Sequence, residues 1–300
     1  MASHWTLPLP SLRCLHVWRR NLLVWRKLAI ASMIGNLADP MLYMLGFGYG
    51  LGRLMPESFG TSYIAFLAAG TVCSSTMMSA SFEAMYSGFS RMHVQKTWEA
   101  IMNAPLTLDD VVAGEAVWAA SKSLLSGLAV LLVAAVLGLC PSWLALWTIP
   151  VIFLTGLAFA GIGLIMTALS PSYDFFVYYM TLVITPMLLT SGVFFPAGQL
   201  PAAVRLATEL LPLAHAVQLV RPLFNGECPP ALGLHLGVLV AYAAGAFYAA
   251  LALAGLGASC IGALLAYPAL RTRGVYLILV TIGISFIIQT LIQNTDYVGG

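Results

Sequence analysis

Charged side chains inside apolar segments are the residues of this chain whose types and spacing could do chemistry, and there are few of them. Glu115 and Lys122 lie two helical turns apart on one face of a predicted helix, and Glu83 lies in the preceding apolar segment. A charge at mid-bilayer costs about 2.5 to 3.5 kcal/mol, so it faces a partner or a cavity. We therefore favour a structural ion pair among these residues over a proton relay.

Other chemistries lack their motifs. The five cysteines and five histidines stand singly, so their spacing predicts neither a disulfide nor a metal site. A Walker A loop needs Gly directly before Lys, yet the three lysines follow Arg26, Gln95 and Ser121. We expect no catalytic site, no bound cofactor or metal and no nucleic-acid partner, so any ATP must be hydrolysed elsewhere.

The composition is that of an integral membrane protein. Of the 300 residues, 60% are hydrophobic and only 8% are charged, far from the averages of soluble domains. A bilayer core about 30 Å thick needs roughly 20 apolar residues per helix. We therefore predict an all-α membrane bundle, with apolar segments at residues 28–54, 62–86, 111–139, 144–169, 175–195, 231–270 and 275–292.

The first apolar segment carries two signals of helix geometry. Asp39 and Pro40 interrupt it, and because Pro disrupts the helical ladder they predict a break there. Glycines follow at the small-xxx-small spacing that lets membrane helices approach closely. Tight packing is favoured over a ligand site at these positions, which are Gly46, Gly48, Gly50 and Gly52.

The placement of basic residues predicts the topology. They crowd residues 1–27 and recur at Arg91 and Lys96, and by the positive-inside rule both regions are cytoplasmic. The region 194–230 is then outside. In residues 1–27, Trp and Leu alternate with Arg at near-helical spacing, which suggests an amphipathic helix lying in the interface. Alternatively, these basic residues only flank the first span and set its orientation in the membrane.

Two polar or broken regions interrupt the apolar pattern. Residues 87–110 form a short, helix-prone, amphipathic cytoplasmic segment, a surface on which a soluble motor could push. The region 194–230 is dense in Pro and Gly, and helices broken at membrane depth occur where they are buried in protein or line a cavity. We expect two short helices that re-enter the outer leaflet there.

Several segments together carry a family resemblance. The run Trp98-Glu-Ala-Ile-Met-Asn-Ala-Pro-Leu106, the element Ser191-Gly-Val-Phe-Phe-Pro196 and the stretch from Leu210 to Arg221 resemble the permease subunit of ABC-2 type exporters. The basic, Trp-containing N-terminus and Asn36-Leu-Ala-Asp-Pro40 are similar to NodJ-like nodulation-factor export permeases. The resemblance covers approximately residues 3–252.

This resemblance implies a six-helix permease domain over residues 28–252. It implies a second permease copy, a separate NodI-like ABC ATPase that holds ATP and Mg²⁺, and a bacterial inner membrane with the N-terminus in the cytoplasm. The cargo is implied to be a lipo-chitooligosaccharide moved outward. The implied contacts with the ATPase are Trp98, Glu99, Met102, Ala104, Pro105 and Leu106.

The cargo path is the least specific inference. A lipid tail favours lateral entry between apolar helices, and aromatic side chains could stack on sugar rings at the exit, although aromatic belts at membrane boundaries produce the same residues. The candidate path and gate residues are Asp39, Tyr178, Tyr179, Ser191, Gly192, Phe194, Phe195 and Pro196. The alternatives are an exporter of a drug or polysaccharide, an ion-coupled secondary transporter, or a non-functional chimera.

Residues 253–300 depart from the pattern. Their run Leu270-Arg-Thr-Arg-Gly-Val-Tyr276 resembles a fragment of the branched-chain amino-acid ABC permeases (LivM-like), too short to form that fold alone. We expect an atypical apolar tail, fused or truncated, with a seventh span near its end. The apolar run 231–270 is compatible with one span followed by a segment in the membrane interface, or with a tight hairpin that turns at Gly255 and Gly257.

Overall fold

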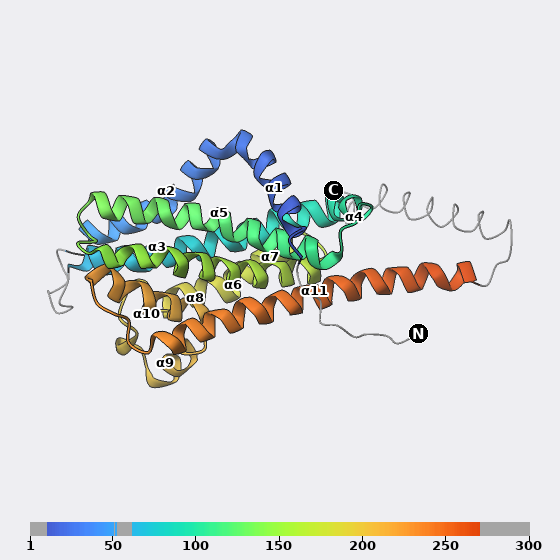
Figure 1. The fold of residues 1–300 in the computed structure, drawn as a ribbon. Coiled ribbons are helices and arrows are strands. Elements are labelled where there is room, and N and C mark those ends of the chain that lie inside the picture. The colour runs from blue at the N-terminus through green and yellow to red at the C-terminus, as the bar shows by residue number, and fades with distance from the viewer. Residues whose placement is uncertain (1–10, 51, 53–61, 271–300) are drawn as a thin grey trace.

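The computed structural model describes residues 11–50, 52 and 62–270, and within these ranges it is helical and contains no strand (Figure 1). The helices are α1 (Cys14–Trp25), α2 (Ala29–Gly50), α3 (Tyr63–Phe82), α4 (Thr97–Met102), α5 (Leu108–Val136), α6 (Thr148–Leu169), α7 (Asp174–Tyr179), α8 (Thr185–Thr190), α9 (Ala202–Thr208), α10 (Pro212–Asn225) and α11 (Leu232–Leu270).

Five helical segments of the described chain are long and apolar enough to cross a membrane. They are Cys14–Gly50, Tyr63–Val94, Leu108–Val136, Trp143–Leu169 and Leu232–Leu256. A sixth is added if α9 and α10, which meet at 85°, count as one broken span, and Asp174–Thr190 is a shorter apolar helix. The all-α membrane fold is confirmed. The region 194–230 contains two short helices, α9 and α10, and their re-entry into the outer leaflet stays a prediction.

Three sequence-based boundaries were wrong. The second span does not end at Tyr86, because helical turns with π geometry carry it on to Val94. Helix α2 runs through Pro40 without a break, and the chain instead turns at the short 3-10 segment Arg26–Leu28. Figure 1 shows α1 and α2 rising from the bundle to an apex there.

The third correction concerns the C-terminal region. Helix α11 is unbroken over 39 residues, so no hairpin forms at Gly255. At 1.5 Å per residue it is about 58 Å long, nearly twice the thickness of a bilayer core of about 30 Å, and it projects beyond the other helices (Figure 1). Ala254, past the expected boundary at 252, is buried in the bundle. The expected seventh span lies outside the described residues.

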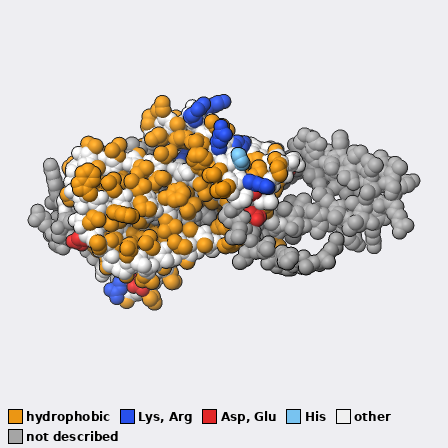
Figure 2. Space-filling view, in the orientation of Figure 1, with side chains coloured by type: hydrophobic (Ala, Val, Ile, Leu, Met, Phe, Trp, Pro, Cys, Tyr) orange, Lys and Arg blue, Asp and Glu red, His pale blue; other side chains and the backbone are white. Residues whose placement is uncertain are grey.

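Helix α6 lies at the centre and packs on α3, α5, α10 and α11. Glycines allow its close approaches, since a Cβ added at Gly161 would lie 2.8 Å from the Cβ of Ala246 in α11. The surface along the bundle is apolar, while Lys and Arg gather near α4 and at the α1–α2 apex (Figure 2). The two ends of the bundle therefore differ: one carries α4, and the other carries α9 and α10.

We predict that Gly161→Leu destabilises the fold by about 1–3 kcal/mol, because overpacking forces α6 and α11 apart. Gly237→Leu is the matched control, since a Cβ at that α11 glycine meets nothing within 4 Å. Thermal unfolding in detergent measures both. Equal melting temperatures for the two variants would contradict the described packing of α6 on α11.

Candidate functional site

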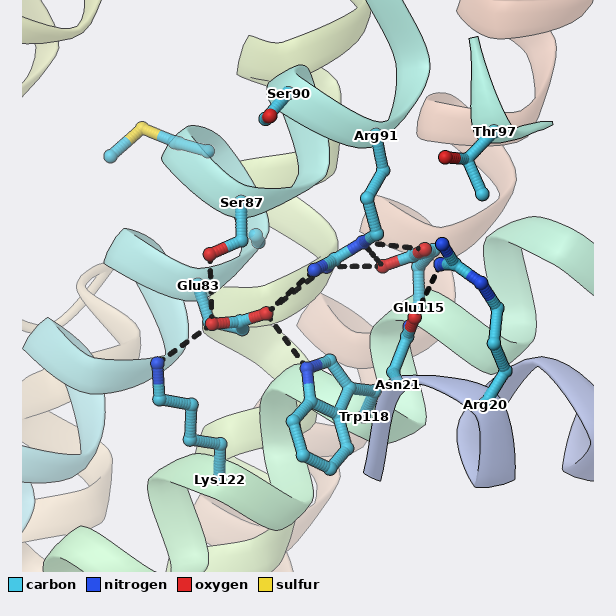
Figure 3. Close-up of polar contacts among 12 residues, drawn as sticks. Arg20, Asn21, Glu83, Ser87, Ser90, Arg91, Thr97, Glu115, Trp118 and Lys122 are labelled. Atoms are coloured by element: carbon cyan, nitrogen blue, oxygen red, sulfur yellow. Dashed lines mark hydrogen bonds and ion pairs between the residues drawn. The ribbon is translucent and has the colours of Figure 1, made fainter. Parts of the chain in front are cut away.

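A buried ionic cluster joins α3 to α5 near the α4 end of the bundle (Figure 3). The Arg91 guanidinium donates to both oxygens of Glu115 at 2.6 to 3.0 Å and, through Nη1 and Nη2, to Oε1 of Glu83 at 3.1 Å. Lys122 Nζ donates to the other oxygen of Glu83 at 2.8 Å. Of the ion pairs that the sequence left open, the structure contains the one between Lys122 and Glu83. Glu115 pairs with Arg91 instead of Lys122, and the sequence had placed Arg91 in a cytoplasmic segment.

Neutral donors complete the coordination of Glu83. Trp118 Nε1 donates to its Oε1 at 2.7 Å, and Ser87 Oγ donates to its Oε2 at 3.0 Å. Both carboxylates are almost fully buried, with exposed fractions of 4% and 1% for Glu83 and Glu115. Removing a charge from such a cluster is costly, because its partners stay buried without compensation. The cluster therefore fixes α3 relative to α5.

Helix α4 is attached to this cluster through Trp98. The indole Nε1 of Trp98 donates to Glu115 Oε1 at 3.3 Å, and the side chain is only 4% exposed. Lys96 before the helix adopts a left-handed conformation (φ 50°) that turns the chain into α4. After the helix, Thr107 and Asp110 form a capping box that starts α5. Helix α4 is thus held between the ends of α3 and α5.

The N-terminal helix is held to the same region. Arg13 Nη1 donates to the Pro105 carbonyl at 2.8 Å, and the backbone N–H and hydroxyl of Ser11 donate to Asp110 Oδ1 at 3.2 and 2.6 Å. Val17 packs on Gly114, where a Cβ would lie 2.5 Å from the Val17 Cβ. The segment 11–25 is therefore attached to the α4–α5 turn and to the first turns of α5.

The six residues expected to contact an ATPase do not share one environment. Glu99, Met102, Ala104 and Pro105 are exposed around α4, and Leu106 is half-buried. Trp98 points into the bundle and holds α4 in place, so its side chain is not part of this surface. The connection between the second and third long helices is shorter than the expected segment 87–110, because residues up to Val94 belong to the preceding helix.

At the other end of the bundle, Ser191, Gly192, Phe194, Phe195 and Pro196 form one element after α8. Gly192 takes a positive φ of 78°, which favours glycine, and its carbonyl accepts a 2.6 Å hydrogen bond from Arg221 Nη2 in α10. Arg221 also lies 3.6 Å above the centroid of the Phe66 ring. In the sequence, Arg221 stood out only as the end of the stretch from Leu210 that carries the family resemblance.

A cavity of about 170 Å³ borders this element, between α2, α3, α5 and α8. Its wall carries the Phe194 ring and Tyr43, whose centroids are 6.0 Å apart. The rest of the wall is rich in hydroxyl groups, which come from Thr71, Ser74, Ser75, Ser79 and Ser126. Such a mixture of rings and hydroxyls suits an amphipathic molecule.

The remaining candidate path residues lie apart from this cavity. Tyr178 and Tyr179 are in α7, toward the α4 end, with 65% and 5% of their surfaces exposed, so they form no common exit surface with Phe194. The expected aromatic exit cluster is wrong for these two residues. Asp39 lies in α2, and its side chain is outside what the structure describes.

The α2 glycines divide into two faces. Gly48 packs on Ile64 of α3, and a Cβ there would lie 2.7 Å from that side chain. Gly46 and Gly50 have nothing within 4 Å of such a Cβ, and Gly52 lies just past the helix. Gly48 therefore forms the close helix contact that the glycine spacing predicted, while Gly46 and Gly50 face away from the bundle.

Comparison with known proteins bears on this arrangement. Residues 13–225 match the model of the ABC-2 type transporter family. Nodulation protein J of Rhizobium meliloti (strain 1021) is 49% identical over 247 residues, covering 82% of this chain and 94% of that protein. The chain belongs to the ABC-2 type transporter family.

Two further relatives agree with this assignment. Nodulation protein J of Rhizobium leguminosarum bv. viciae is 51% identical over 238 residues, covering 79% of this chain and 92% of that protein. Inner membrane transport permease YadH of Escherichia coli (strain K12) is 24% identical over 234 residues, which cover 77% of this chain and 90% of that protein. As an ABC-2 permease subunit the chain is a multi-pass membrane protein, and ATP hydrolysis belongs to a separate subunit.

One histidine pair was missed by sequence reasoning. His215 Nδ1 in α10 lies 2.7 Å from His235 Nδ1 in α11, and His215 Nε2 lies 2.8 Å from the Glu209 carbonyl. The spacing of 20 residues matches no metal motif, and among the described residues no third ligand joins them. The pair connects the broken helix α9–α10 to α11.

We predict that Arg91→Gln destabilises the bundle by about 3–5 kcal/mol, because two buried carboxylates lose their shared cation. Arg91→Lys should cost less, since it keeps the charge but not the two-sided hydrogen-bonding geometry. Arg26→Gln, at an exposed basic position, serves as the control and should change stability by under about 0.5 kcal/mol. Unfolding in detergent measures all three, and similar losses for Arg91→Gln and Arg26→Gln would contradict the described cluster.

Proposed function

We propose that this permease subunit exports an amphipathic lipid-linked saccharide, a lipo-chitooligosaccharide, and that a NodI-like ATPase drives it by pressing on α4. The observation that carries the proposal is the attachment of α4 to the bundle through Trp98, Glu115 and Arg91. Force applied to the exposed face of α4 reaches α5 through Glu115 and α3 through Arg91. The ATPase would hold ATP and Mg²⁺.

The charge distribution supports an orientation for this machine. Most Lys and Arg of the described chain lie in α1, in the turn after it or around α4, and only Arg205 and Arg221 lie at the opposite end. By the positive-inside rule, this distribution supports a cytoplasmic location for α4 and the N-terminus. We propose the inner membrane of a bacterium as the location, with α9 and α10 toward the outside.

The cargo assignment has two supports. The relatives that share about half of their residues with this chain are called Nodulation protein J, and the chain spans more than nine-tenths of their length. The cavity beside Phe194 combines aromatic rings with hydroxyl groups, which is suitable for sugar rings and their hydroxyls. Its wall includes α2, a helix with exposed apolar side chains that a lipid chain can follow.

A second copy of the permease is part of the proposal. Helix α2 forms one wall of the cavity through Gly35, Pro40 and Tyr43, and it carries large exposed apolar side chains such as Leu42 and Leu45. Gly46 and Gly50 lie open on the same helix, at the spacing of close helix pairs. Two α2 helices meeting there would enclose the two cavities between the copies.

We predict that the double variant Glu99→Arg with Pro105→Asp abolishes cargo-stimulated ATP hydrolysis while the melting temperature stays unchanged. Both side chains are exposed, so the bundle tolerates the change. The surface presented to the ATPase loses its acidic charge at position 99, gains a basic one there and gains an acidic charge at position 105. Proteoliposomes that contain the permease and its ATPase provide the assay.

Glu209→Arg is the control for this experiment, because it makes the same acid-to-base exchange as Glu99→Arg at an exposed position near the end of α9. It should retain wild-type stimulation. Wild-type stimulation in the α4 double variant would refute coupling through this surface.

We also predict that Gly35→Leu blocks transport of the lipo-chitooligosaccharide without unfolding the bundle. Gly35 lines the 170 Å³ cavity, and a Cβ there meets nothing within 4 Å, so a larger side chain extends into open space. Gly237→Leu controls for an added leucine in a helix. If Gly35→Leu exports at the wild-type rate in a proteoliposome assay, the cavity is not on the cargo path.

A further inference from the structure

A second and larger cavity lies beneath the α1–α2 apex. It has a volume of about 480 Å³ and is enclosed by α1, the turn to α2, the end of the α3 span and α5. Arg20, Asn21 and Trp25 line it from α1, and Glu83, Arg91 and Lys122 line the opposite side. We call it the apex cavity. The ionic cluster described above forms its floor, and no part of the proposed coupling or cargo path uses its α1 wall.

Two hydrogen-bond donors of α1 have no partner in the described part of the chain. Asn21 is only 3% exposed, and its Nδ2 donates to nothing, although its Oδ1 accepts from Arg20 Nη1 at 3.0 Å. Trp25 Nε1 is also buried without an acceptor, while its ring packs edge-on against Trp118. Buried polar groups are normally satisfied, so both point to an acceptor supplied by a bound molecule.

The chemistry of that molecule follows from what the cavity lacks. Glu83, the carboxylate in the cavity lining, already accepts from Arg91, Trp118, Lys122 and Ser87. The unpartnered atoms of α1 are both N–H groups. Both therefore call for acceptor oxygens, and a phosphodiester offers oxygens that only accept.

Charge leads to the same conclusion. Three cations, Arg20, Arg91 and Lys122, meet two carboxylates, Glu83 and Glu115, which leaves a formal charge of +1 around the cavity. Figure 3 shows Arg20 reaching from α1 toward Glu115, beside the Arg91 guanidinium. An anion that enters from the α1 side neutralises this excess and receives charge-assisted hydrogen bonds from Arg20.

The wall above the polar floor indicates that the anion carries acyl chains. Val24 and Leu28 line the same cavity and are 58% and 68% exposed. Leu28 begins the apolar run that continues into α2, and Val24 lies one helical turn before it, so acyl chains can leave the cavity along these two side chains. We propose that the apex cavity binds the phosphodiester head of an anionic phospholipid, which is held by Arg20, Asn21 and Trp25 and fastens α1 to the bundle.

The test compares lipids on the purified full-length chain in detergent. Dioleoyl phosphatidylglycerol should raise the melting temperature more than dioleoyl phosphatidylcholine or inorganic phosphate does, and native mass spectrometry should show it retained. Trp25→Phe removes the indole N–H but keeps a ring beside Trp118, and Arg20→Gln removes the charge. Each should weaken phosphatidylglycerol binding about tenfold, the effect of losing one charge-assisted or buried hydrogen bond.

Arg19→Gln is the matched control, because Arg19 is the exposed neighbour of Arg20 and does not line the cavity. It should bind phosphatidylglycerol like the wild type. The proposal is overturned if Arg19→Gln and Arg20→Gln weaken binding equally, which would indicate attraction by surface charge alone. It is also overturned if inorganic phosphate stabilises as strongly as the lipid, or if Trp25→Phe binds the lipid unchanged.

Discussion

The arrangement of this permease depends on one guanidinium. Arg91 bridges two carboxylates that come from different helices and are nearly inaccessible to water. Three charges in such a place are tolerated only with complete hydrogen bonding, which Trp98, Trp118 and Lys122 supply. Glu83 and Arg91 each lie in a π-helical turn, Glu83–Ser87 and Ser90–Val94, in keeping with the occurrence of π geometry at functional sites.

Much of the fold could be predicted from hydrophobic runs, because length and apolarity alone identify membrane helices. The pairing of Lys122 with Glu83 was also foreseeable, since mid-membrane charges seek partners. Arg91 was wrongly assigned to the segment between two helices. The helix that carries it extends past the apolar run, and the polar residues at its end look like a loop in the sequence. Pro40 wrongly predicted a helix break, because neighbouring helices can accommodate a proline inside a membrane helix. The contact of His215 with His235 depends on a helix pair bent by 85°, which no spacing rule encodes.

The candidate site followed the sequence only in part. Glu99, Ala104 and Pro105 are exposed as the motif implied, since short polar helices between spans present their outer face to water. Trp98 lies on the same short helix but on its inner face, and only the position of Glu115 reveals this. Tyr178 and Phe194 are both aromatic and seemed equivalent in the sequence. They lie in different elements, Tyr178 in α7 and Phe194 in the element after α8, and these lie toward opposite ends of the bundle.

The long helical segment Tyr63–Val94 connects the features of the molecule. At one end it carries Glu83 and Arg91, which attach it to α4 and α5. Its middle supplies Ser74, Ser75 and Ser79 to the cavity, and near its start Gly70 packs directly on Val193. Because packed helices shift as rigid bodies, a displacement of α4 that tilts this segment must also move the element Ser191–Pro196. One continuous helical segment thus connects the proposed ATPase surface, the cavity and the end of the bundle opposite α4.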